Sequence, residues 1–121
     1  MKTILSVLLL ALAVGCATFE TTAYRIIGST AIAVDGAMTA WGDYVRSGQA
    51  TPEQEARARA AYERYQTAMR SARIAVTAWK QAGGTEPRTA LESLGQAADA
   101  VIAIVRELLP TELRERVKVR T

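Results

Sequence analysis

Three regular stripes of apolar residues constrain the fold of this chain more than any other feature. Within each stripe the residues recur three and four positions apart, the spacing that places them on one face of an α-helix. The first stripe is Tyr24, Ile27, Ala31, Val34, Met38, Trp41 and Val45. The second is Ala58, Tyr62, Tyr65, Met69, Ala72, Val76 and Trp79. The third is Leu91, Leu94, Ala98, Val101, Val105 and Leu108. The sequence therefore predicts three long amphipathic helices.

Capping residues in the sequence indicate where the first two helices begin and end. We expect the first to begin at Thr18, as an N-cap after a short tether, and to end at Gly48. Thr51 precedes Pro52 and lies three positions before Gln54, the arrangement of a capping box with proline in the first turn. The second helix is therefore predicted to begin immediately after Thr51.

The third helix and the end of the chain are bounded in the same way. The paired glycines from Gly83 stop the second helix, and the third opens at Thr85 or Thr89 and ends before Pro110. Residues 111–121 then form a short helix capped by Thr111 and a basic tail, which we expect to be frayed. The basic residues of this region are Arg114, Arg116, Lys118 and Arg120.

Short loops make consecutive helices antiparallel neighbours, and in that arrangement the three stripes match layer by layer. The middle layer would hold Ala31, Ala72 and Ala98. Bulky layers would flank it, made of Tyr24, Trp79 and Leu91 at one end and of Trp41, Tyr62 and Leu108 at the other. The fold class predicted is an all-α, antiparallel, up-down-up three-helix bundle with coiled-coil-like heptads. We interpret the aromatic layers as core, with a ligand cavity between them as the alternative.

The N-terminus carries the features of an export signal. Lys2 precedes an apolar run over residues 4–14, which is followed by Gly15 and by Cys16, the only cysteine. The segment Ala13-Val14-Gly15-Cys16 resembles the lipobox of bacterial lipoproteins, although Ala13 stands where that family usually has leucine.

The resemblance implies how the protein is processed and where in the cell it is located. Residues 1–15 would be a cleaved signal peptide, and Cys16 would carry diacylglyceryl and N-acyl groups. Residues 16–110 would then form a lipid-anchored bundle. In that family the residue after the cysteine influences sorting, and Ala17 implies the inner leaflet of the outer membrane, facing the periplasm.

This segment has three alternative interpretations. An ordinary secretory signal cut after Ala13 would leave Cys16 as a free thiol. An uncleaved membrane span is disfavoured because spanning needs about twenty apolar residues. A disulfide within the chain is excluded because Cys16 has no second cysteine to pair with.

The amino-acid composition excludes several classes of functional site. Histidine is absent, so neither a Ser-His-Asp triad nor a Cys-His pair can form within one chain, and a zinc site is excluded as well. The formal charge is only +3, which is weak support for a nucleic-acid partner. Because no phosphate-binding loop or metal-ligand spacing occurs either, we expect a binding protein with no cofactor beyond the acyl groups, and not an enzyme.

One face of the first predicted helix lacks the charges expected of a solvated surface. Small and apolar residues off its core stripe form a candidate partner surface: Gly28, Ile32, Ala33, Gly36 and Ala40. In the third helix Ile102 and Ile104 also lie off the stripe. Such faces favour contact with a second copy or an envelope protein, and an Ala-rich exterior tolerated by a monomer is the alternative. We therefore expect a structural or interaction module, or alternatively a carrier of lipids or small hydrophobic ligands.

Overall fold

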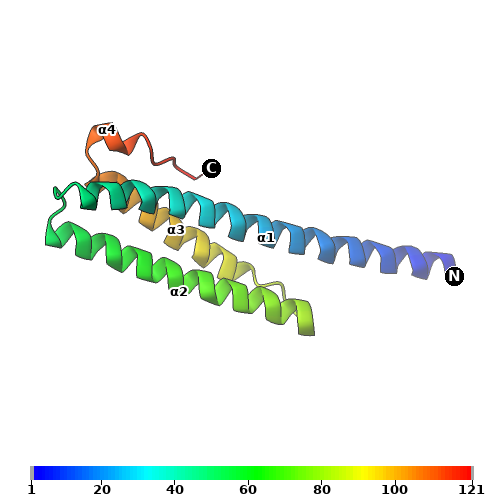
Figure 1. Ribbon diagram of the computed structural model, residues 1–121. Coiled ribbons are helices and arrows are strands. Elements are labelled where there is room, and N and C mark those ends of the chain that lie inside the picture. The colour runs from blue at the N-terminus through cyan, green and yellow to red at the C-terminus, as the bar shows by residue number, and fades with distance from the viewer. Residues whose placement is uncertain (1, 121) are drawn as a thin grey trace.

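The computed structural model describes the backbone of residues 2–120 and the side chains of residues 18–120. These residues form four helices and no strand: α1 (Lys2–Arg46), α2 (Pro52–Ala82), α3 (Arg88–Leu108) and the short α4 (Thr111–Arg114). The protein is an all-α, up-down-up bundle of three main helices, and α2 runs antiparallel to α1 and α3 (Figure 1). The predicted fold class is therefore confirmed.

The start of α2 has the predicted capping box. The backbone N–H of Gln54 donates to Thr51 Oγ1 at 3.2 Å, and the backbone N–H of Thr51 donates to Gln54 Oε1 at 3.0 Å. Each bond satisfies a backbone donor that the end of a helix leaves without a partner. The preceding turn uses Gly48 at φ 81°, a left-handed conformation that suits glycine.

The other helix starts differ from the predictions. In the full-length chain α1 continues through Thr18, so Thr18 is not its N-cap. Helix α3 begins at Arg88 directly after Pro87, because proline ends the preceding loop with a fixed φ, and the capping box expected at Thr89 is not formed. Pro110 precedes α4 in the position where Thr111 was expected to cap it.

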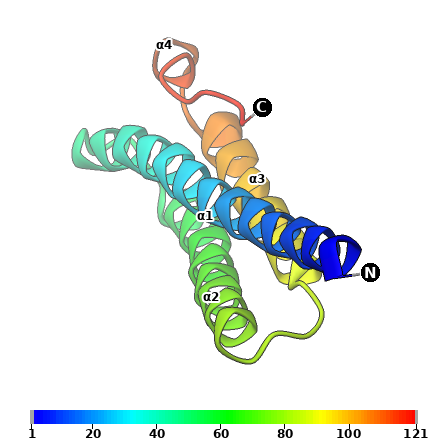
Figure 2. The ribbon, with the colours of Figure 1, turned by 90° about the vertical axis from the view of Figure 1, so that its right-hand side faces the viewer.

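Contacts at the two ends of the bundle establish the direction of each helix. At one end Phe19 of α1 packs edge-to-face on Trp79 near the end of α2, with ring centroids 4.9 Å apart. At the other end Arg57 near the start of α2 pairs with Glu107 at the end of α3, at 3.2 Å. Helix α3 packs extensively on both neighbours, whereas α1 and α2 touch over a smaller area (Figure 2).

The predicted stripes of α2 and α3 form the core. In α2 the buried members are Ala58, Tyr65, Met69, Ala72 and Val76, and in α3 they are Leu91, Leu94, Ala98, Val101 and Val105. The remaining stripe members, Tyr62, Trp79 and Leu108, are half-buried against this core. Ile102, which was expected to lie off the stripe on a free face, is also buried, because α3 is covered on two sides and needs a wider apolar face.

The core face of α1 is rotated from the predicted stripe by part of a turn. Ile27, Val34 and Trp41 are buried as expected. At the other stripe positions, the preceding residues Ala23, Thr30 and Ala37 are buried in place of Tyr24, Ala31 and Met38. Small side chains let α1 approach α3 closely. The interface therefore favours alanine and threonine at these positions over the bulkier tyrosine and methionine of the predicted stripe.

The burial of Thr30 generates a first prediction. Its side chain is completely buried, and Oγ1 has no hydrogen-bond partner among the described residues. Valine has the same shape without the hydroxyl, so Thr30→Val should raise the free energy of unfolding by about 1 kcal/mol. Thermal and denaturant unfolding followed by circular dichroism measure this change.

Thr39 is the matched control on the exposed side of the same helix. Its Oγ1 donates to the Asp35 carbonyl at 2.8 Å in contact with solvent. Thr39→Val should therefore change stability by less than about 0.5 kcal/mol. Destabilisation by Thr30→Val would contradict the burial of an unpaired hydroxyl at this position.

Candidate functional site

The predicted partner surface on α1 is partly present. Gly28 and Gly36 are exposed, and a Cβ added to either would meet no atom within 4 Å. Ile32 lies between them in sequence and is 75% exposed, more than Ile74 of α2 or Val119, which are 64% and 63% exposed. These three residues, spaced four apart on one face, are called the α1 outer face below.

Two members of the predicted surface do not belong to it. Ala40 is only 1% exposed and lies in the core, so assigning it to a partner surface is wrong. Ala33 is half-buried and packs against the core. Both deviations follow from the rotation of α1, which turns Ala33 and Ala40 toward the core and leaves Ile32 outside.

Several residues of the predicted core layers lie in the core. Trp41, Ala72 and Ala98 are buried. The half-buried members that pack against the core are Ala31, Tyr62, Trp79 and Leu108. Both aromatic ends of the bundle are thus packed, and the ring of Trp41 lies 5.6 Å from that of Tyr44.

Tyr24 is not a core residue, contrary to the prediction. It is 49% exposed, and Phe19 takes the place against Trp79 that Tyr24 was expected to fill. The Tyr24 hydroxyl accepts a hydrogen bond from Lys80 Nζ at 3.0 Å, and Lys80 also pairs with Glu20 at 3.0 Å. The hydrogen bond to Tyr24 and the contact with Glu20 raise the pKa of Lys80.

A slot of about 480 Å³ opens between α1 and α3 near the Phe19 end of the bundle. Its apolar lining comes from Phe19 and Ile26 of α1 and from Leu91 and Gly95 of α3. Its polar lining comprises Thr22, Arg88, Glu92, Gln96, Asp99 and Arg120. An apolar floor with a polar rim is the usual composition of a small-ligand site.

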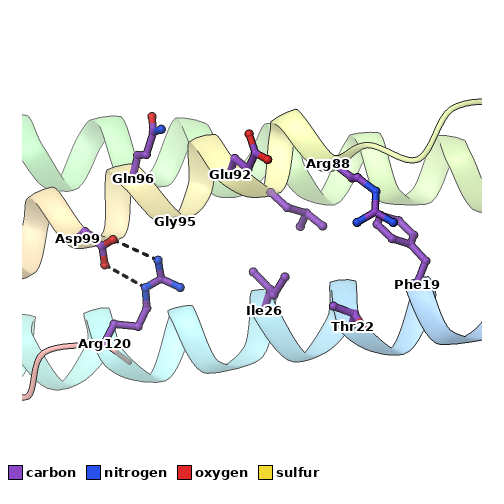
Figure 3. A pocket seen from close by; sticks show the side chains of 10 residues that line it. Phe19, Thr22, Ile26, Arg88, Glu92, Gly95, Gln96, Asp99 and Arg120 are labelled. Atoms are coloured by element: carbon purple, nitrogen blue, oxygen red, sulfur yellow. Dashed lines mark hydrogen bonds and ion pairs between the residues drawn. The ribbon is translucent and has the colours of Figure 1, made fainter.

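Two arginines stand at opposite ends of this slot (Figure 3). The Arg88 guanidinium lies over the Phe19 ring, 5.1 Å from its centroid, and pairs with Glu86 at 3.0 Å. At the other end Arg120 binds both carboxylate oxygens of Asp99, at 3.0 and 3.2 Å. Each guanidinium thus already has a carboxylate partner, which leaves the slot without a strong excess of positive charge.

Arg120 belongs to a segment that was expected to be frayed. Residues 110–120, called the C-terminal segment below, instead fold back over α1 and α3 (Figure 1). Arg116 pairs with Asp43 of α1 at 2.8 Å, and Arg46 also contacts that carboxylate. Hydrogen bonds from Arg116 and Arg46 lower the pKa of Asp43.

The sequence carries two signals for the slot that the three stripes do not include. Phe19 lies four positions before Ala23, in phase with the buried face of α1 and out of phase with the predicted stripe that starts at Tyr24. Gly95 interrupts a strongly helical pattern, and an isolated glycine at such a position indicates close approach by another group. That group is Arg120, whose Nη2 lies 2.8 Å from where a Gly95 Cβ would stand.

The predicted lipidation residue, Cys16, lies outside the residues whose side chains the structure describes. Within the described part of the chain, no helix has the length and hydropathy of a membrane span. The same part holds no cluster of acidic, cysteine or histidine side chains suited to a metal ion. Comparisons with protein-family models, with curated proteins and with solved structures found no match.

The C-terminal segment generates a second prediction. Val117 is 1% exposed, and its carbonyl accepts a hydrogen bond from Arg106 Nη1 at 2.7 Å. Val117→Ala removes two buried methyl groups and should lower the free energy of unfolding by about 1 to 2 kcal/mol. Urea unfolding of the full-length protein measures the loss.

Val119 provides the control within the same segment, because it is 63% exposed. Val119→Ala should change stability by less than about 0.5 kcal/mol. Equal effects of the two substitutions would mean that the segment is not docked through Val117.

Proposed function

We propose that the protein is a bacterial or phage lipoprotein, anchored through acylated Cys16 in the inner leaflet of the outer membrane. Its helical bundle faces the periplasm and works as a structural or interaction module through helix–helix contacts. The partner is a second copy or another envelope protein, and no catalysis is involved. The basis for the anchor is the lipobox-like sequence ending at Cys16.

The observation that carries the interaction function is the α1 outer face. Ile32 projects from the surface, while Gly28 and Gly36, one turn away on either side, leave open space beside it. A partner helix can approach closely at the glycines and cover the isoleucine, which removes an exposed apolar side chain from water. The only charged residue between Gly28 and Gly36 is Asp35.

The end of the bundle nearest Cys16 suits a membrane surface. Phe19 follows Cys16 by three positions and contacts both Trp79 and Arg88. Lys80 lies at the same end, beside Tyr24. Aromatic rings and basic side chains are favoured at the level of lipid headgroups, so an anchor at Cys16 would orient this end toward the membrane.

The anchor predicts covalent lipid on one residue. Full-length protein produced in a bacterium with a labelled fatty acid should incorporate label and fractionate with the outer membrane, because two or three acyl chains bind a bilayer firmly. Cys16→Ala should lose both properties. Equal label in the wild type and in Cys16→Ala would contradict the lipoprotein assignment.

The interaction function predicts a partner at position 32. A photo-crosslinking amino acid placed there in the full-length protein should give adducts in the membrane fraction. The same amino acid at Arg70, an exposed position on α2, is the control and should give few. Absence of adducts at position 32, or equal adducts at both positions, would contradict the proposal that a partner binds the α1 outer face.

The slot between α1 and α3 favours a second candidate function, carriage of a lipid or small hydrophobic ligand. Its floor of Phe19, Ile26 and Leu91 is apolar, and the Phe19 ring lies against Trp79. This alternative gives the opposite result at position 32, no adduct. It also predicts that a fatty acid changes the fluorescence of Trp79, measured in a Trp41→Phe variant that has no other tryptophan. Phe19→Ala should weaken that response.

A further inference from the structure

The exposed side of α1 carries a second regular stripe of residues. Its members recur four and three positions apart, the spacing that keeps them on one face of a helix. All of them are exposed, and two of them, Gly28 and Ile32, belong to the α1 outer face. This set, called the outer stripe below, is Thr21, Arg25, Gly28, Ile32, Asp35 and Thr39.

The outer stripe is complementary to itself when it is turned end for end. Both of its ends are threonine. Next to the ends stand residues of opposite charge, Arg25 and Asp35, and at the centre Gly28 stands next to the large apolar Ile32. Two stripes that run in opposite directions therefore place each charge opposite its counter-charge and each open glycine position opposite an isoleucine.

Arg25 and Asp35 are the two charges in residues 18–46 whose side chains form no ion pair among the described residues. The other three charged residues of this range each have a partner: Glu20, Asp43 and Arg46. Arg25 and Asp35 cannot pair with each other, because ten positions along one helix separate them by about 15 Å. A second copy of the chain supplies a counter-charge for each of them.

We propose that the outer stripe is a self-complementary interface through which α1 pairs with α1 of a second copy in the antiparallel direction. Arg25 of each copy then faces Asp35 of the other, and Ile32 of each copy packs beside Gly28 of the other. A Cβ added at Gly28 would meet no atom within 4 Å, so this space is open to a partner side chain. Each contact occurs twice, related by a two-fold axis near position 30.

Charge and size both oppose the parallel arrangement of the same two stripes. In parallel register Arg25 would face Arg25 and Asp35 would face Asp35, and like charges at such positions repel. The two copies of Ile32 would meet each other, while the open space at both copies of Gly28 would stay unfilled. The outer stripe thus specifies one direction of pairing.

This inference rests on the proposed interaction function and deepens it, because it names the partner as a second copy and fixes its direction. In an antiparallel pair the Phe19 ends of the two copies lie at opposite ends of the pair. Anchored copies would therefore pair along one membrane surface or between two facing membranes. The contact itself depends on α1 and not on Cys16.

Charge reversal tests both the pairing and its direction. Arg25→Asp alone, or Asp35→Arg alone, places like charges at both ionic contacts of an antiparallel pair. Either variant should weaken self-association of the full-length protein in a non-ionic detergent about tenfold. The double variant Arg25→Asp/Asp35→Arg restores opposite charges at both contacts and should associate like the wild type. Sedimentation equilibrium over a range of protein concentrations measures the association constants.

Arg70→Asp is the matched control for the same change of charge. Arg70 lies on α2, is exposed, and forms no ion pair among the described residues. Its reversal should leave self-association unchanged. Circular dichroism of each variant establishes that it is folded.

A wild-type protein that stays monomeric over the whole concentration range would overturn the pairing. Single reversals without effect would overturn the antiparallel direction, because a parallel pair opposes like charges before and after the change. Weakening that the double variant does not restore would overturn it as well. In each case photo-crosslinks from position 32 to a different protein would keep the proposed interaction function, and fatty-acid labelling of Cys16 reports on the anchor independently.

Discussion

The close packing of α1 against α3 is the constraint on which the rest of the structure depends. It is possible because small side chains on the buried face of α1 (Ala23, Thr30 and Ala37) alternate with the larger Ile27, Val34 and Trp41. Small residues shorten the distance between helix axes and fill the interface without voids. A helix that presents this face inward must present its opposite face outward. The exposure of Ile32 and Tyr24 is therefore a consequence of how α1 packs.

The same packing creates the surface on which the C-terminal segment docks. Ion pairs between exposed side chains contribute little stability individually, so Arg116–Asp43 and Arg120–Asp99 mainly set the register of the segment. The apolar contact of Val117 supplies most of the free energy of docking. The segment thereby closes one end of the slot, and Phe19 with Arg88 closes the other. The slot, the C-terminal segment and the α1 outer face all lie on α1 and α3. The exposed side of α2 mixes charged and small polar residues with one exposed isoleucine, Ile74.

Much of the fold follows from local patterns. The capping box at Thr51 and the stripes of α2 and α3 are predictable because each apolar position there is bulky or flanked by charged residues. The buried face of the first helix is harder to predict. Small and apolar residues occur on all sides of this helix, so several phases of a heptad fit equally well. The heptad phase that contains Tyr24 is wrong and the phase that contains Ala23 is right, because the interface with α3 favours small side chains.

The candidate site was less predictable for a related reason. Ile32, Gly28 and Gly36 were identified because the absence of charge on a helix face is a local property of the sequence. The slot and the docked segment depend on contacts between residues far apart in the chain, such as Arg120 with Gly95 and Asp99. Neither the fold-back after Pro110 nor the pairing of particular arginines with particular aspartates follows from helical periodicity. A basic tail with alternating valines is compatible with docking and with disorder alike.

The orientation of α1 is the central claim, and solvent paramagnetic relaxation of side-chain methyl groups tests it most directly. With a water-borne paramagnetic probe, the methyl protons of Ala23, Ala37 and Ala40 should be strongly protected, and those of Ile32 should relax fast. Partner contacts at Ile32 are avoided by measuring at low protein concentration. Fast relaxation of Ala37 and Ala40 together with protection of Ile32 would contradict the account, because α1 would then bury the opposite face.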